Sequence, residues 1–186
     1  LKQSFLIGAW IQKYHSKVAD WFDVISFFDA QNSLANYVFN HPEFHTAKID
    51  SKATCVLDAV KLGHSLLKKE GRVDNDFIID NEQFFIVTGA NMAGKSTFLR
   101  TVSSSIVLCN MGLPICAEKA VYAPIKLITS MRTSDSLAEG SSYFFAELRR
   151  LKTIVEAVKS DKYFIILDEI LKGTNSHDKA LGSKKI

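Results

Sequence analysis

The residues best suited to chemistry lie in a glycine-rich segment. Residues 89–96 fit the pattern G-x-x-x-x-G-K-[ST] in full, and a threonine follows them. The glycines of such a loop let backbone N–H groups converge closely on a phosphate. Lys95 can then reach the β- and γ-phosphates, and the Ser96 hydroxyl can bind Mg²⁺. We therefore expect a nucleoside triphosphate to contact the following residues: Gly89, Ala90, Asn91, Met92, Ala93, Gly94, Lys95, Ser96 and Thr97.

The segments on either side of this loop fit the same interpretation. Residues 84–88 are largely apolar, which predicts a buried strand, and Phe98, Leu99 and Val102 predict a helix over residues 95–111. The N-terminus of that helix would add a partial positive charge beside the phosphates. The alternative is a glycine-containing turn that matches the pattern by chance, and the flanking strand and helix argue against it.

Two carboxylates follow a second apolar run. Residues 163–167 predict another buried strand, and Asp168 and Glu169 come directly after it. Ligands gather at the carboxyl ends of parallel strands, where carboxylates are costly unless they serve a purpose. Asp168 can hold Mg²⁺ directly or through a water, and Glu169 can orient or deprotonate a water that attacks the γ-phosphate. The alternative is a chance acidic pair at a strand end.

A small polar segment, residues 134–142, precedes a well-marked helix. The apolar residues of that helix step by four and three, namely Phe144, Leu148, Leu151, Val155 and Val158. Ser141 or Ser142 is a natural N-cap for it. Free backbone N–H groups at a helix start also make an anion site, and the residues alone leave these two interpretations open.

The remaining elements are predicted from periodicity and breakers. Residues 1–40 predict one or two helices, which a proline at position 42 ends, and a domain boundary lies within residues 41–50. Further strands are predicted at residues 53–57, 73–79, 115–117, 120–122 and 125–129. The strand over 73–79 is expected to form a hairpin with residues 84–88 that leads into the glycine-rich loop. His41 and His45 are interpreted as surface histidines rather than metal ligands.

Composition sets the outer limits. The chain has 186 residues, of which 47% are hydrophobic and 23% charged, as in one sizeable α/β domain with or without an appendage. Its net charge of +3 permits nucleic acid as a partner, but no dense basic run argues for it. Three scattered cysteines without metal spacing predict reduced thiols in the cytoplasm, and the lack of a long apolar run predicts no membrane contact. Because the chain starts at Leu1 and stops soon after the Asp-Glu pair, we expect a piece of a longer protein.

Three blocks of the chain, taken together, resemble the ATPase domain of MutS-family proteins, a branch of the ABC-type ATPases. The family's T-G-P-N-M-x-G-K-S-T block is similar to residues 88–97, and its D-E-I-x-x-G-T-x-x-x-D block to residues 168–178. Residues 134–144 with Glu147 resemble the family's signature segment. Weaker likenesses are Gly63-His64, Asn75-Asp76 and the S-L-A of residues 33–35. At Ala93 and at the L-K of residues 171–172, the sequence resembles the short MutS-related proteins more than the main repair protein.

The resemblance implies a fold, an organisation and a mechanism. The fold would be an α/β phosphate-loop NTPase of ABC type, with a mixed or parallel sheet flanked by helices. A helical lever fragment at residues 1–45 would precede an ATPase domain at residues 46–186, truncated at its C-terminus. ATP would bind with Mg²⁺ held by Ser96 and Asp168, with Glu169, Lys95 and Asp168 catalytic. Ser141 and Ser142 would meet the γ-phosphate bound by a second copy.

In that mechanism ATP closes a homodimer and hydrolysis opens it, and DNA, in mismatch repair, binds through regions outside this chain. Residues 73–77 would flank the adenine. Ala90 stands where the family has proline, and Ser65 replaces the proline after the histidine, but neither change removes a chemical group. Two alternatives remain. One is another ABC-type ATPase, although residues 138–142 read A-E-G-S-S rather than beginning L-S-G-G. The other is an ATP-gated interaction module with negligible turnover.

Overall fold

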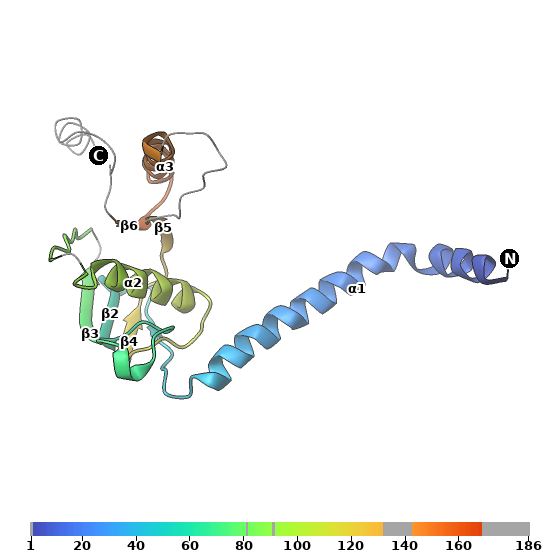
Figure 1. Ribbon diagram of the computed structural model, residues 1–186, viewed down its shortest axis with the longest axis horizontal. Coiled ribbons are helices and arrows are strands. Elements are labelled where there is room, and N and C mark those ends of the chain that lie inside the picture. Colours follow the sequence, from blue (N-terminus) through green and yellow to red (C-terminus); the bar gives the residue numbers. More distant parts are fainter. Residues whose placement is uncertain (1, 81, 91, 132–142, 169–186) are drawn as a thin grey trace. The chain divides into compact units, whose positions relative to one another are not determined.

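The computed structural model describes residues 2–80, 82–90, 92–131 and 143–168 (Figure 1). Contacts between residues divide the chain into two units, Leu1–Glu43 and Phe44–Ile186. The first unit is mostly one helix, and the second holds all the described strands.

Helix α1 spans Lys2–Asn40 without interruption, so the first unit holds one helix rather than two. It ends where Pro42 disfavours helical geometry in the residue before it, which confirms the predicted break. Large apolar side chains such as Phe5 and Phe28 are exposed within this unit. Ring contacts within the helix join Trp10 to Tyr14 and Tyr14 to Trp21.

A four-stranded mixed sheet forms the centre of the second unit. Its strands are β1 (Lys48–Ile49), β2 (Cys55–Leu62), β3 (Asn75–Asp80) and β4 (Lys119–Tyr122), in the order β1-β4-β2-β3. β1 and β4 are parallel, whereas β2 runs antiparallel to both of its neighbours. The β2–β3 pairing is irregular beside Lys61, whose φ is 52° and whose N–H donates to Asp76 Oδ1 at 2.9 Å. The Asp76 carboxylate thus satisfies a backbone group that the distorted strand leaves without a strand partner.

A second, two-stranded sheet follows in the chain. Strands β5 (Lys126–Ser130) and β6 (Tyr163–Leu167) pair in parallel over their whole length. The strand predicted at residues 163–167 is confirmed at both ends, and the one predicted at 125–129 begins and ends one residue later. Of the β6 side chains only Ile166 is buried, so the strand is less enclosed than its apolar run indicates.

Helix α3 spans Tyr143–Ala157 and packs on this pair of strands. Its buried residues are Leu151 and Ile154. The predicted apolar stripe is therefore wrong in part, because Leu148 and Val155 are 40% exposed while Ile154, which the prediction omitted, lies in the contact. Among the helix positions whose burial the structure describes, Leu151 and Ile154 form the buried face.

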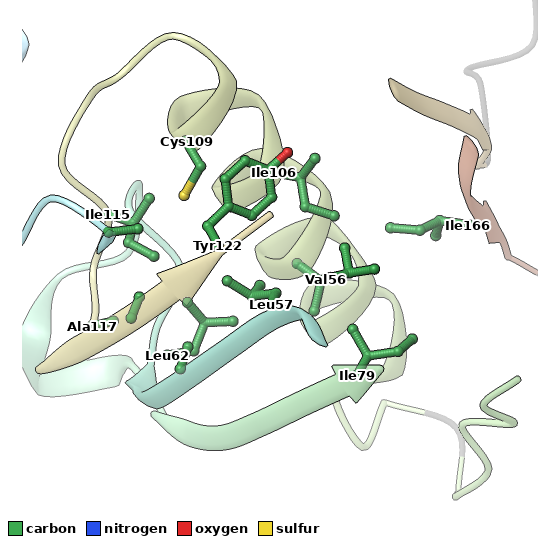
Figure 2. Close-up of a cluster of buried hydrophobic side chains, with 14 residues drawn as sticks. Val56, Leu57, Leu62, Ile79, Ile106, Cys109, Ile115, Ala117, Tyr122 and Ile166 are labelled. Atoms are coloured by element: carbon green, nitrogen blue, oxygen red, sulfur yellow. The ribbon is translucent and has the colours of Figure 1, made fainter. Parts of the chain in front are cut away.

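Helix α2 spans Lys95–Asn110 and covers one face of the four-stranded sheet (Figure 1). It ends just before Gly112, as predicted. Figure 2 shows the apolar core between this helix and the sheet, with Leu57, Ile106 and Tyr122 at its centre. Burial raises the pKa of the Cys109 thiol to about 12, so this thiol stays protonated and packs as an apolar group. All three cysteines are free, as the sequence predicts.

Residues 84–88 do not form the predicted strand. Their backbone is irregular, and Phe84 and Ile86 are 84% and 75% exposed. An apolar run becomes a strand only where another strand pairs with its backbone. Among the residues that the structure describes, no strand pairs with this segment.

The predicted hairpin between residues 73–79 and 84–88 is wrong for the same reason. The turn is present, held by the Gln83 side chain, which bonds the N–H and the carboxylate of Asp80 at 3.0 and 3.1 Å. The chain then leaves the sheet, and β3 pairs instead with β2, which precedes it.

The strand predicted at residues 115–117 is also wrong. Ile115 makes one isolated bridge with His45, and the N–H of Ala117 folds back to the Ile115 carbonyl at 2.9 Å. Pro114, which has no N–H to donate, precedes this bend. A tight turn in the backbone therefore replaces a continuous ladder here.

Candidate nucleotide-binding site

The glycine-rich loop joins directly to the start of α2. Gly94, immediately before the helix, has φ 87° and ψ 10°, a left-handed conformation that glycine adopts without strain. Its carbonyl accepts the first helical hydrogen bond, from the N–H of Phe98, at 2.9 Å. Met92 also has a positive φ, 66°, and its side chain is fully exposed. The second glycine of the motif is thus required by geometry, and the left-handed Met92 is a feature that the motif did not predict.

The Lys95 side chain folds back across the loop. Its Nζ donates to the carbonyl oxygens of Gly89, at 2.8 Å, and Ala90, at 2.7 Å. These two carbonyls lie at the opposite end of the loop from Lys95, so the lysine closes the loop on itself. An ammonium that binds neutral carbonyl dipoles can exchange them for the anionic oxygens of a phosphate, which bind it more strongly.

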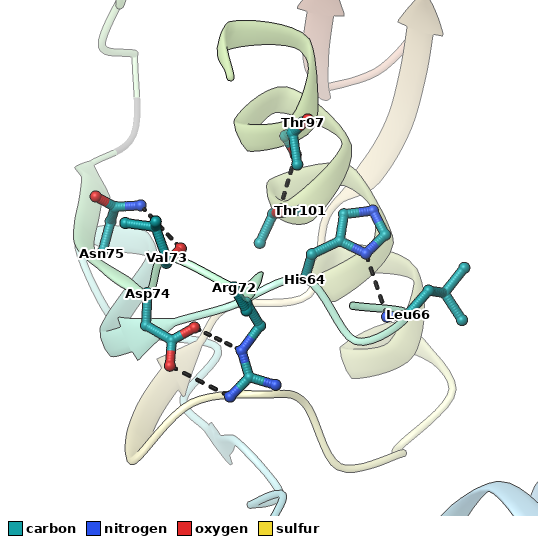
Figure 3. A network of polar contacts seen from close by, with 8 residues as sticks. All are labelled: His64, Leu66, Arg72, Val73, Asp74, Asn75, Thr97 and Thr101. Atoms are coloured by element: carbon teal, nitrogen blue, oxygen red, sulfur yellow. Dashed lines mark hydrogen bonds and ion pairs between the residues drawn. The ribbon is translucent and has the colours of Figure 1, made fainter. Parts of the chain in front are cut away.

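Ser96 and Thr97 continue the motif into the first turn of α2. Ser96 is half-buried and Thr97 is exposed. The Thr97 carbonyl accepts a hydrogen bond from Thr101 Oγ1 at 2.8 Å (Figure 3). The Thr101 carbonyl accepts one from the buried Ser105 hydroxyl at 2.8 Å. The hydroxyls deeper in α2 are therefore used within the helix, and the Ser96 hydroxyl lies nearest the loop.

Asp168 follows β6 directly and extends its pairing with β5 by one hydrogen bond. Its N–H donates to the Ser130 carbonyl at 2.9 Å, and the residue is half-buried. Within the described part of the chain, no hydrogen bond or ion pair joins Asp168 to Lys95 or Ser96. Asn91, Ser141, Ser142 and Glu169 lie outside the described residues.

The donors that these elements offer suit Mg²⁺. The Ser96 hydroxyl and the Asp168 carboxylate supply hard oxygen ligands, which Mg²⁺ prefers, and this ion keeps several waters besides one or two protein ligands. Across the described residues, no group of three or more His, Cys, Asp and Glu side chains could hold a metal ion. A metal in this part of the chain would therefore rely on water or phosphate oxygens to complete its coordination.

A polar cluster lies between β2 and β3, beside α2 (Figure 3). Arg72 Nε and Nη2 donate to the two carboxylate oxygens of Asp74 at 2.6 and 3.2 Å. This ion pair lies against Gly63, where an added Cβ would come within 2.2 Å of Asp74 Oδ1. The sequence indicated Gly63 only through its resemblance to the family, and it did not indicate Arg72 or Asp74. A sequence pattern does not show which side chains from elsewhere in the chain pack against a glycine.

His64 and Phe77 connect this region to α2. His64 Nδ1 accepts the Leu66 N–H at 3.2 Å, and burial, assisted by the charge of Arg100, lowers the pKa of His64. Phe77, in the segment predicted to flank adenine, packs edge to face on Phe98 of α2 with ring centroids 5.5 Å apart. Phe77 thus contacts α2, and His64 lies near enough to α2 to feel the charge of Arg100.

The two histidines that the sequence placed at the surface differ in their contacts. His45 Nδ1 lies 2.9 Å from the Ala117 carbonyl, and His41 Nδ1 lies 3.8 Å from a Glu43 carboxylate oxygen. The exposed His45 side chain therefore contacts the backbone at residue 117.

Comparison with known proteins identifies the family. The family model described as MutS domain V matches residues 85–183. The chain is 32% identical over 161 residues to the DNA mismatch repair protein MutS of Halothermothrix orenii, covering 83% of this chain and 18% of that protein. It is 33% identical over 153 residues to DNA mismatch repair protein MutS of Thermotoga maritima, covering 71% of this chain and 19% of that protein.

A third relative, DNA mismatch repair protein MutS of Syntrophomonas wolfei, is 32% identical over 172 residues, covering 89% of this chain and 20% of that protein. The glycine-rich loop and the Asp-Glu pair both lie inside the matched residues 85–183. The chain belongs to the MutS family. It spans about a fifth of the length of these relatives.

Within the described residues, no helix combines the length and the apolar character that crossing a membrane requires.

Proposed function

We propose that this chain is the ATP-binding and ATP-hydrolysing part of a MutS-type mismatch repair protein, with a phosphate-loop fold of ABC type. The observation that carries the proposal is the closed loop before α2, in which the left-handed Gly94 starts the helix and Lys95 Nζ reaches the carbonyls of Gly89 and Ala90. The names of the relatives, all DNA mismatch repair proteins, support the same activity.

In this proposal each described residue has a limited task. Lys95 would leave the loop carbonyls and bind the β- and γ-phosphates, while the N-terminus of α2 adds its partial positive charge. Ser96 and Asp168 would hold Mg²⁺, which neutralises phosphate charge when bound. Glu169, the next residue, would orient or deprotonate the attacking water.

The site would be completed by a second copy of the protein. Helix α3 begins at Tyr143, directly after Ser141 and Ser142. Those serines would therefore stand at a helix N-terminus, where an anion is favoured, and would meet the γ-phosphate held by the other subunit. ATP would close the homodimer and hydrolysis would open it.

The test uses the full-length protein and three single substitutions. Lys95→Ala removes the phosphate contact, so ATP affinity should fall about 10- to 100-fold, the effect of losing hydrogen bonds to a charged group. Glu169→Gln should leave ATP binding intact and reduce turnover by about 100-fold or more, as the loss of a general base does. Lys152→Ala removes an exposed lysine from α3 and should change neither quantity.

The measurements are equilibrium binding of a fluorescent ATP analogue and phosphate release at saturating ATP. Unchanged affinity in Lys95→Ala would show that the loop does not bind phosphate, and the proposal would be wrong. Equal turnover by the wild type and Glu169→Gln would show that the catalytic role of Glu169 is wrong. Negligible turnover by the wild type, with ATP binding intact, would instead favour an ATP-gated interaction module.

A further inference from the structure

A closed set of hydrogen bonds joins the end of α2 to the start of β5. Tyr122, the last residue of β4, is fully buried, and its hydroxyl donates to Asn110 Oδ1 at 2.8 Å. Asn110 Nδ2 donates to the Ile125 carbonyl at 2.9 Å, and the Ile125 N–H donates to the Tyr122 hydroxyl at 3.2 Å. Each group is matched by a partner of the opposite kind, so the Asn110 amide can take only one orientation in this network.

These bonds connect α2, which carries the proposed Mg²⁺ ligand Ser96, to β5, whose partner strand β6 leads to the other proposed ligand, Asp168. Asn110 is the last residue of α2, and the same helix begins at Lys95 and Ser96. A helix of 16 residues is a stiff rod about 24 Å long, so fixing one end constrains the direction of the other. Ile125 immediately precedes β5, which pairs with β6 as far as Ser130, and the Ser130 carbonyl holds the N–H of Asp168.

Apolar packing alone would not set the position of this strand pair. Ile166 of β6 is buried in the same core as Ile106 of α2, and Leu127 of β5 is packed against that core. Burial of this kind is non-directional, so it holds the strands on the helix without specifying how far they slide along it. Hydrogen bonds have narrow preferred distances and angles, and the Asn110–Tyr122 network supplies them at the point where β5 begins.

Two further observations make this point of attachment rigid. Between Tyr122 and β5 the chain has only Ala123, Pro124 and Ile125, and the ring of Pro124 restricts its φ. Burial raises the pKa of the Tyr122 hydroxyl, which therefore remains a hydrogen-bond donor throughout the neutral range. Both Asn110 and Tyr122 lie far along the chain from the glycine-rich loop and from Asp168.

We propose that Asn110 and Tyr122 are positioning residues that fix the register of the β5–β6 pair on α2, and thereby place Asp168 relative to Ser96 for binding of the divalent metal ion. This inference rests on the proposed function. Neither side chain touches the nucleotide or the metal in this scheme. They act through the helix and the strand that carry the ligands.

The experiment uses the full-length protein and the substitution Tyr122→Phe, which removes one hydroxyl and keeps the buried ring. Binding of Mn²⁺ to the ATP-loaded protein is measured by electron paramagnetic resonance, and nucleotide binding is measured in excess chelator. We expect Mn²⁺ affinity to fall about five- to tenfold, the usual effect of losing one buried hydrogen bond. Nucleotide affinity without metal should stay within about twofold of the wild type.

The matched control is Ser105→Ala. Ser105 is 1% exposed and its hydroxyl donates to the Thr101 carbonyl at 2.8 Å, so this change also removes one buried hydroxyl from the α2 region. This hydrogen bond lies within α2 and does not involve β5, so Mn²⁺ affinity should remain that of the wild type. A second variant, Asn110→Asp, keeps the acceptor for Tyr122 and loses the donor to Ile125, so it should weaken Mn²⁺ binding as Tyr122→Phe does.

The outcomes separate this inference from the proposed function. If Tyr122→Phe and Ser105→Ala weaken Mn²⁺ binding equally, the effect is a general loss of stability and the positioning role is wrong. Unchanged Mn²⁺ affinity in Tyr122→Phe, with normal nucleotide binding by the wild type, would also overturn it. If the wild type binds no nucleotide at all, the proposed function itself fails.

Discussion

At the scale of single residues, two glycines are required for different reasons, and the glycine-rich motif reveals only one of them. Gly94 is required because its backbone is left-handed, and the motif marks it. Gly63 is required for another reason, since the ion pair of Arg72 and Asp74 lies directly against it. The first requirement is local to the loop, whereas the second comes from side chains that lie more than eight residues further along the chain.

Gly63→Ala tests this second requirement. An added Cβ would lie 2.2 Å from Asp74 Oδ1 and 2.5 Å from Arg72 Nε, so the ion pair would have to move. We expect the free energy of unfolding to fall by about 1–3 kcal/mol, as for other overpacked sites. Urea denaturation measures the change.

Gly71→Ala is the matched control, because nothing lies within 4 Å of a Cβ built there. Its free energy of unfolding should stay within about 0.5 kcal/mol of the wild type. Equal stabilities for the two variants would show that the Arg72–Asp74 pair yields without cost and that Gly63 has no steric role.

At the scale of elements, strand β5 connects three parts of the second unit. Its start is bonded to Asn110 of α2, and its end is bonded to Asp168 after β6. Between these, the Thr129 carbonyl accepts two hydrogen bonds from Arg150 of α3, from Nε at 3.0 Å and Nη2 at 2.7 Å. The helix that follows Ser141 and Ser142 is thus tied to the strand that supports Asp168.

Arg150→Lys should loosen this attachment. A lysine has one nitrogen and cannot supply the planar pair of donors that the guanidinium directs at one carbonyl. Arg150 is exposed, so we expect a modest effect, about a fivefold loss of amide hydrogen-exchange protection along α3. Hydrogen exchange followed by mass spectrometry measures it.

The control for this prediction is Lys152→Ala on the same helix. Lys152 makes an exposed ion pair with Glu156 at 3.8 Å, and such pairs contribute little. Exchange along α3 should be that of the wild type in this variant. If Arg150→Lys behaves in the same way, the bonds to Thr129 do not hold α3 on the strand.

At the scale of the whole molecule, the chain corresponds to one part of its MutS relatives. It spans about a fifth of the length of its MutS relatives and divides into a helical unit and an α/β unit. Its net charge is only +3, and no dense basic run is present in the sequence. The proposed function therefore assigns the DNA contact to regions outside this chain.

A salt series with the full-length protein tests the DNA partner. Because DNA binding releases counterions, affinity should fall at least about tenfold between 50 and 200 mM salt, as expected for two or more phosphate contacts. ATP should change the affinity in the wild type, whereas Lys95→Ala should keep the salt dependence and lose the response to ATP. Binding that is indifferent to salt would argue against a DNA partner.

The local parts of this protein could be predicted from the order of its residues. Helix α2 and the left-handed glycine before it follow from the glycine-rich motif, and β6 follows from an uninterrupted apolar run. These features depend on neighbours within a few positions, where backbone sterics and side-chain period decide the conformation. The proposed roles of Lys95, Ser96 and Asp168 were predicted in the same way, from residue types at fixed spacing.

The pairing of the strands and the contacts between residues far apart in the chain became visible only in the tertiary structure. The apolar run at residues 84–88 has the composition of a strand, yet β3 pairs with β2 instead, because a strand exists only where a second backbone completes its hydrogen bonds. The Asn110–Tyr122 bond and the Arg72–Asp74 pair against Gly63 bring together groups that no local period relates. The sequence therefore predicts which residues could bind a phosphate and a metal ion, whereas only the tertiary structure shows the contacts that surround them.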